Sequence, residues 1–162
     1  MSHSHSHTHG PSHHHDEHAV TDETRGGRWE TLDAKFEGAA THVALLHTNK
    51  ILAFGGSALD PEALAHPLPA ELLDLSTFTV RPVPMAGVVG DLFCGGQTFL
   101  EDGTLLVVGG TSRYQPWWHP FPAGRKESYI FDPPTEVWRR LPDIPIGRWY
   151  PTLLRLADNS VL

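Results

Sequence analysis

The hydrophobic positions of this chain fall into short runs separated by polar turns. Residues 47–57 read HTNKILAFGGS, and residues 100–111 read LEDGTLLVVGGT. Each stretch has a polar turn, then four or five apolar residues, then a Gly-Gly pair; the pairs begin at Gly55 and Gly109, 54 residues apart. Short apolar runs bounded by turns predict β-strands, and a fixed spacing indicates a repeated structural unit.

A third copy of the pattern begins near the C-terminus, where residues 155–162 read RLADNSVL. Its turn, Asp158-Asn159, follows the Asp102-Gly103 turn of the second copy by 56 residues. Asn and Gly accept the positive φ that tight hairpin turns require. Each copy is therefore predicted to begin with a β-hairpin.

Each complete copy also predicts a second pair of strands after its Gly-Gly pair. These strands are residues 70–75 and 78–84 in the first copy, and 126–133 and 135–142 in the second. No segment keeps a helical period over three turns, because prolines interrupt the one stretch with helical character. The pattern thus predicts units of four short antiparallel strands.

Four-stranded units that repeat at about fifty residues are typical of kelch-type β-propeller blades. The predicted fold class is all-β: an incomplete kelch-type β-propeller over residues 27–162, with two four-stranded blades plus the first strand of a third. The competing interpretation is a β-sandwich whose hairpins happen to be similar. Trp138, in the fourth strand of the second copy, is expected to pack between adjacent blades.

The number of repeats is small for a closed propeller. Propellers close with about four to eight blades, and each repeat buries its apolar face against a neighbour. We therefore expect a truncated product or a piece of a longer protein. On its own, such a chain is expected to have exposed sheet edges and low stability.

The N-terminal segment differs from the rest of the chain. Residues 1–26 begin MSHSHSHTHGPSHHHDEH, which holds eight of the twelve histidines and no large apolar side chain. Such a segment cannot bury enough apolar surface to offset the entropy of ordering it, so a disordered His-rich arm is predicted. Loose binding of Ni(II), Cu(II) or Zn(II) is expected of it. A metal-gathering role, an uninvolved polar tail and a purification tag all remain open.

Charge and cysteine content exclude several classes of protein. The formal net charge is −7 and no cluster of Lys and Arg occurs, which argues against a nucleic-acid or anionic-membrane surface. Cys94 is the only cysteine, so an intrachain disulfide and an all-Cys zinc site are excluded. No secretory signal or membrane-spanning run is visible. The compartment is unknown, with the cytoplasm as the default expectation.

Two motifs go beyond a generic repeat. Residues 91–111, DLFCGGQTFLEDGTLLVVGGT, followed by residues 147–162, GRWYPTLLRLADNSVL, resemble the galactose oxidase and glyoxal oxidase family of copper radical oxidases. Residues 41–56, THVALLHTNKILAFGG, resemble the first blade of that family. The resemblance covers about residues 27–162, the whole globular part.

The resemblance implies a cofactor built from two side chains. In the family, a cysteine and a tyrosine are joined by a thioether and the tyrosine also binds copper; the matching positions here are Cys94 and Tyr150. Cys94 lies 15 residues before Gly109, and Tyr150 lies 15 residues before position 165, where the repeat spacing places the next Gly pair. The two residues are therefore predicted at one height on the first strands of adjacent blades.

The implied activity is oxidation of a primary alcohol or aldehyde by dioxygen, with hydrogen peroxide as the second product. The family's second tyrosine ligand and two histidine ligands match nothing in this chain, so the chain alone is expected to be inactive. The histidines that do not match those ligand positions are His42, His47, His66 and His119. Alternatively, Cys94 is an inert buried thiol, Tyr150 is a half-buried strand aromatic, and the chain is a non-catalytic kelch-repeat module for binding or structure.

Overall fold

The computed structural model describes residues 27, 29–38, 40–55, 69–113 and 123–162. The chain divides into two compact units, residues 1–31 and 32–162, and all strands given below belong to the second unit. The predicted His-rich arm, residues 1–26, lies outside the described residues. Within the described part, no helix is long and apolar enough to cross a membrane.

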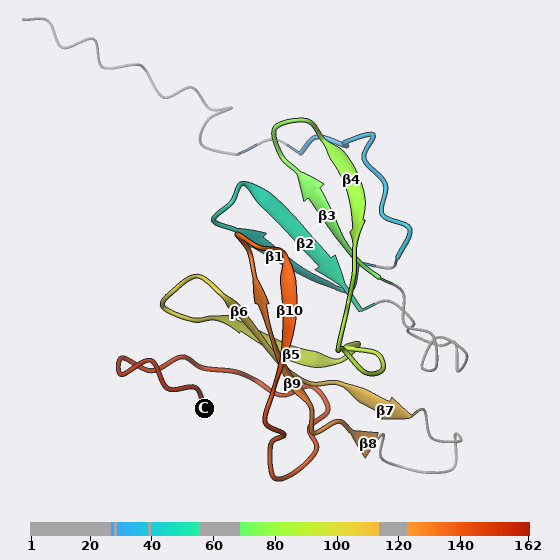
Figure 1. Ribbon diagram of the computed structural model, residues 1–162. Helices are drawn as coiled ribbons and strands as arrows, with labels where there is room; N and C mark the ends of the chain where they lie inside the picture. Colours follow the sequence, from blue (N-terminus) through green and yellow to red (C-terminus); the bar gives the residue numbers. More distant parts are fainter. Residues whose placement is uncertain (1–26, 28, 39, 56–68, 114–122) are drawn as a thin grey trace, which may run out of the picture. The chain divides into compact units, whose positions relative to one another are not determined.

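Two four-stranded antiparallel sheets follow the two complete copies of the sequence repeat (Figure 1). The first sheet has the order β1-β2-β3-β4, with β1 (His42–Leu46), β2 (Lys50–Phe54), β3 (Ala70–Asp74) and β4 (Thr79–Val83). The second has the order β10-β9-β6-β5, with β5 (Gly95–Phe99), β6 (Leu105–Gly109), β9 (Ser128–Asp132) and β10 (Val137–Leu141). A two-stranded ribbon joins β7 (Thr111–Arg113) and β8 (Ala123–Gly124).

The predicted all-β class and the two four-stranded units are confirmed. Each strand after a Gly-Gly pair is shorter than the sequence pattern predicts, because the turn residues at both ends leave the ladder. The β7–β8 ribbon was not predicted. Its strands have three and two residues, too few to show an alternation of apolar and polar positions.

The core contains apolar side chains from both sheets. Leu52 and Phe54 of β2 belong to one buried cluster with Phe131 of β9 and Trp138 of β10. The Phe54 and Trp138 rings meet edge to face, with centroids 5.6 Å apart and planes at 78°. The expected position of Trp138 between neighbouring units is confirmed.

The second sheet carries the same apolar pattern as the first. The repeat equivalents of Leu52 and Phe54 are Leu106 and Val108, which line an open groove of about 680 Å³. Part of the groove wall comes from the third hairpin, including Leu162. The residues that bury the first sheet against the second thus have counterparts in the second sheet that line a groove and are 8% and 7% exposed.

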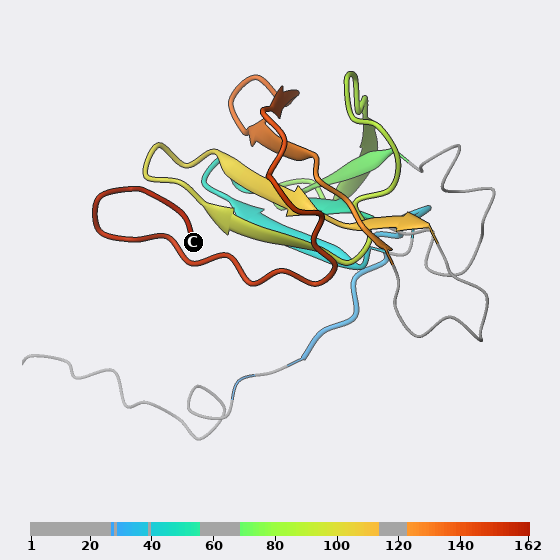
Figure 2. The ribbon, with the colours of Figure 1, turned by 90° about the horizontal axis from the view of Figure 1, so that it is seen from below.

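Residues 151–162 form the predicted third hairpin, which in Figure 2 (red) runs beside the β5–β6 hairpin. Leu154 and Leu162 exchange two main-chain hydrogen bonds, of 2.9 and 3.0 Å. The Glu101 N–H donates to Asn159 Oδ1 at 3.1 Å and ties the third turn to the second. The ladder contains only an isolated bridge, so the predicted first strand of a third unit is present as an irregular hairpin.

The hairpin turns have the backbone that the sequence predicts. Asn49, Gly103 and Asn159 occupy one repeat position and have φ of 60°, 81° and 65°. In the second and third turns, an Asp Oδ1 accepts bonds from both the N–H and the hydroxyl of the residue two positions on. The Thr104 hydrogen bonds hold the pKa of Asp102 below its ordinary value.

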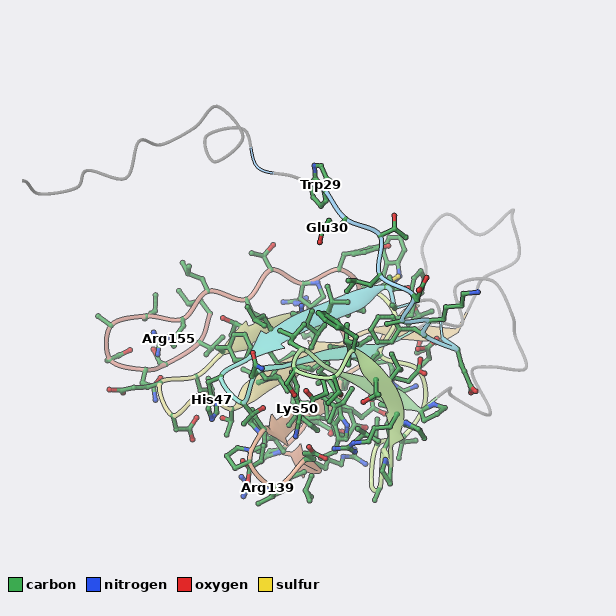
Figure 3. The ribbon with its side chains drawn as sticks, turned by 90° about the horizontal axis from the view of Figure 1, so that it is seen from above. Trp29, Glu30, His47, Lys50, Arg139 and Arg155 are labelled. Atoms are coloured by element: carbon green, nitrogen blue, oxygen red, sulfur yellow. The ribbon has the colours of Figure 1, made fainter. Side chains whose placement is uncertain are left out.

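An ion cluster links the two sheets at their rim. Glu136, in the turn between β9 and β10, accepts a hydrogen bond from Lys50 Nζ at 2.8 Å and another from Arg81 Nη2 (Lys50 is labelled in Figure 3). Both cations belong to the first sheet. Arg81 first, and then Lys50, lower the pKa of the Glu136 carboxyl. Because the cluster is partly exposed, its ion pairs contribute little to stability.

His42, at the start of β1, packs against the core with no partner for one ring nitrogen. Its ring stacks on Phe54, with centroids 5.3 Å apart and planes at 20°. Its buried Nε2 has no hydrogen-bond partner among the described residues. Burial therefore lowers the pKa of His42.

We expect Leu52→Ala to lower the free energy of unfolding by about 2–5 kcal/mol, because it opens a cavity in the core of a marginally stable chain. Leu45→Ala is the control, since Leu45 is in the same hairpin but 65% exposed; it should stay within about 0.5 kcal/mol of the parent. Urea unfolding followed by tryptophan fluorescence measures both. Equal losses would contradict a core that buries the β2 face.

We expect stability to fall as the pH drops below about 6.5, the ordinary pKa of His42. Only the unfolded chain binds the proton there, so the loss grows until the folded-state pKa is reached. Melting temperatures between about pH 7.5 and pH 5 should lose this slope in His42→Phe and keep it in the control His47→Gln. A slope unchanged in His42→Phe would show that another group causes it.

Candidate functional site

Cys94 lies in a tight turn immediately before β5. The turn is closed by the Gly95 N–H, which donates to Leu92 O at 2.9 Å, and by the Phe93 N–H, which donates to Asp91 Oδ1 at 2.9 Å. Cys94 has a left-handed backbone, with φ of 63°. Its side chain is a free thiol, 1% exposed. Local hydrogen bonds thus fix a buried sulfur at the entry to the strand.

Tyr150 has the same backbone conformation at the entry to the third hairpin, with φ of 53°. Its N–H donates to the main-chain oxygen of Cys94 at 2.8 Å. The side chain is 59% exposed, and its ring meets the Trp149 ring edge to face at a centroid distance of 4.6 Å. The structure thus places the main chains of Cys94 and Tyr150 in direct hydrogen-bond contact.

The position of the pair differs from the prediction in one respect. Cys94 and Tyr150 were expected on first strands, but β5 begins at Gly95, one residue after Cys94. Cys94, with its left-handed backbone, belongs to the tight turn that leads into the strand. Both side chains therefore lie at turns, where a residue can point away from the sheet face.

Ala40 is the counterpart of this pair in the first unit. It lies 15 residues before Gly55, the same interval that separates Cys94 from Gly109, and its φ is 42°. Positive φ is uncommon for residues other than glycine, so its occurrence at three equivalent positions is a property of the repeat. The 15-residue interval in the sequence was the signal that could have identified Ala40.

Buried charge near the pair is neutralised locally. Arg125 forms an isolated bridge with Arg148, and the Arg148 N–H donates to Arg125 O at 2.8 Å. The Arg125 guanidinium donates to Glu127 Oε1 at 2.7 Å. The segment that leads into Tyr150 is thus anchored by main-chain bonds, next to a paired cation.

The donor set for a metal is incomplete in the described residues. They contain no group of three or more His, Cys, Asp and Glu that could hold a metal ion. His66 and His119 lie outside the described residues. Cu(II) favours several N and O donors in tetragonal geometry, and Tyr150 offers one phenol oxygen. The described part of the chain does not fit copper by itself.

Comparison with known proteins yields one curated relative and a similar solved structure. No model of a known protein family matches the chain. The chain is 28% identical over 163 residues to the aldehyde oxidase GLOX of Vitis pseudoreticulata, a match that covers 84% of this chain and 28% of that protein. Over most of its length, the chain is thus similar to a protein of the galactose oxidase and glyoxal oxidase type.

The fold of this oxidase-like chain is found in an experimental structure as well. It superimposes on a fungal alcohol oxidase of the AA5 family, solved in complex with copper, with a TM-score of 0.60 and 20% sequence identity. That match covers 78% of this chain and 25% of the fungal protein. The oxidase-like chain therefore spans only about a quarter of the length of either protein.

The adjacency of the pair can be tested without copper. Residues joined by a main-chain hydrogen bond have Cα atoms about 5 Å apart, within the span of about 4.4–6.8 Å that disulfides require. We expect Tyr150→Cys to form an intramolecular disulfide with Cys94 under mild oxidation. Thiol titration and mass spectrometry of the monomer measure it.

Trp149→Cys is the matched control, since position 149 neighbours position 150 but no main-chain bond to Cys94 is assigned to it. It should form the disulfide more slowly. A Tyr150→Cys variant that keeps two free thiols, or that reacts no faster than the control, would contradict the adjacency.

Proposed function

We propose that this chain belongs to a copper radical oxidase that oxidises a primary alcohol or aldehyde with dioxygen and releases hydrogen peroxide. Cys94 and Tyr150 form its thioether cofactor, and the Tyr150 oxygen is a copper ligand. One observation supports the proposal most directly: the Tyr150 N–H donates to Cys94 O at 2.8 Å, so the main chains of the two residues are neighbours. The oxidase names of both similar proteins support it.

Formation of the thioether is a two-electron oxidation of the two side chains. A bond forms between Cys94 Sγ and the ring carbon ortho to the Tyr150 hydroxyl, and the S–H and that C–H break. Two electrons and two protons pass to dioxygen, which becomes hydrogen peroxide. Sulfur at the ortho position makes the phenol easier to oxidise, so a radical on the ring is longer-lived. The Trp149 ring packs against the phenol ring at a centroid distance of 4.6 Å.

In this proposal the two sheets are the first two blades of a kelch-type propeller, and the third hairpin begins the next. Copper, when bound, supplies a one-electron acceptor that works together with the oxidised ring. The chain's residues hold the phenol oxygen in place, while the other donors come from outside the described residues. We therefore propose that the 162 residues alone have no oxidase activity.

A second function is favoured by the state of Cys94. Cys94 is 1% exposed, and a lone buried cysteine is commonly an inert packing residue, as expected in a kelch-repeat module that only binds or supports a partner. Both functions use the same scaffold. They differ in the fate of Cys94 under oxidising conditions with copper.

To test the oxidase function, the longest gene product that contains this chain is loaded with Cu(II) under oxygen and digested. We expect one peptide that contains both Cys94 and Tyr150, with a mass two hydrogens below the sum of its parts. Peroxide release on primary alcohols or aldehydes should accompany it. Cys94→Ser and Tyr150→Phe should both abolish the linked peptide and the activity.

The 162-residue chain, treated in the same way, is the control for the missing donors. It should keep an alkylatable Cys94 and release no peroxide. If Cys94 of the copper-loaded longer product also stays fully alkylatable, the binding or structural module is the correct function.

A further inference from the structure

We infer that residues 109–111 act as a bracket that sets the position of Tyr150 relative to Cys94. The bracket, Gly109-Gly110-Thr111, is held on one side to Phe93, the neighbour of Cys94, and on the other to Arg148, two residues before Tyr150. Its importance for catalysis depends on the proposed oxidase function. Its control of the distance between the two residues does not.

On the Cys94 side, Thr111 holds the main chain twice. Its N–H and its hydroxyl both donate to the oxygen of Phe93, at 2.8 and 3.1 Å. Thr111 is fully buried, and both of its donors are satisfied by this one oxygen. A Cβ on Gly110 would lie 3.2 Å from the same oxygen and 3.1 Å from Asp91 O, a closer approach than most side chains accept.

On the Tyr150 side, the bracket lies against the Arg148 main chain. The Gly110 N–H donates to Arg148 O at 3.1 Å. A Cβ on Gly109 would lie 2.6 Å from Arg148 O, and a Cβ on Gly124, across the β7–β8 ribbon, would lie 2.2 Å from the Arg148 carbonyl carbon. Since non-bonded Cβ contacts below 3.0 Å essentially never occur, Arg148 can take this place only beside glycine.

These contacts join the two site residues through one short rigid path. The Thr111 N–H donates to Phe93 O, and the Gly110 N–H donates to Arg148 O. The Tyr150 N–H then donates directly to Cys94 O. A side chain at position 109 would push Arg148 outward and move Tyr150 with it. Reacting atoms need to lie about 3–3.5 Å apart, and a misplacement of about 1 Å can cost about 100-fold in rate. Gly109, Gly110 and Thr111 are thus positioning residues for the pair.

The first test compares two glycine substitutions in the Tyr150→Cys chain. Gly109 and Gly87 have nearly equal φ, 75° and 78°, so replacement by Ala has a similar backbone cost at both. Only Gly109 faces Arg148, because a Cβ on Gly87 has no atom within 4 Å. We expect Gly109→Ala to slow disulfide formation at least about tenfold. Gly87→Ala should leave the rate unchanged, although both lower the melting temperature.

The second test uses Thr111, where the substitution removes one hydrogen bond and little volume. Thr111→Val lacks the hydroxyl that donates to Phe93 O. We expect it to slow the disulfide several-fold, and we expect Thr111→Ser, which keeps the hydroxyl, to restore the rate. If Gly109→Ala fails to fold, this pair of variants decides the matter.

The inference would be wrong if the disulfide rates of all the variants simply followed their melting temperatures. That result would mean that the glycines matter only for general packing. The same conclusion follows if Thr111→Val and Thr111→Ser behave alike. The readout needs neither copper nor oxidase activity. A responsive disulfide with no thioether in the longer product would therefore reject the proposed function and leave the bracket intact.

Discussion

The structure depends on one apolar face of the first sheet being buried against the second. Leu52 and Phe54 of the first sheet belong to the same buried cluster as Phe131 and Trp138 of the second sheet. Burial of large aliphatic and aromatic side chains is the main favourable term in folding, and the strands in this chain are too short to be stable singly. With the sheets fixed in this way, the entry turns of successive hairpins come together at Cys94 and Tyr150.

Much of this architecture could be predicted because short stretches of sequence determine the turns and the strands. Turn residues that accept positive φ, such as Asn49 and Asn159, mark the hairpins, and the apolar runs between them give the strands. The spacing of the repeats then aligns Cys94 with Tyr150. The repeat thus predicted that the two residues hold equivalent positions in successive units.

The features that escaped prediction depend on contacts between distant residues. Nothing in the residue types of Cys94 or Tyr150 indicates the left-handed backbone that both have, and the hydrogen bond between them joins residues 56 positions apart. The buried His42 Nε2, which finds no hydrogen-bond partner in the part of the chain that the structure describes, is equally invisible, as is the stacking of its ring on Phe54. The crowding of Arg148 by Gly109 and Gly124 arises only when residues far apart in the sequence are packed together.

The irregular third hairpin has a consequence for the chemistry of Tyr150. The hairpin lacks a continuous ladder, and beyond the bracket it rests on an open groove. Segments with few buried contacts open locally at a small free-energy cost, without global unfolding. Each opening would carry the phenol away from the sulfur, so the fraction of time the two spend together equals the closed population of this hairpin. Any further packing that fills the groove would raise the closed population of the hairpin. A more stable groove would therefore make the reaction between Cys94 and Tyr150 faster.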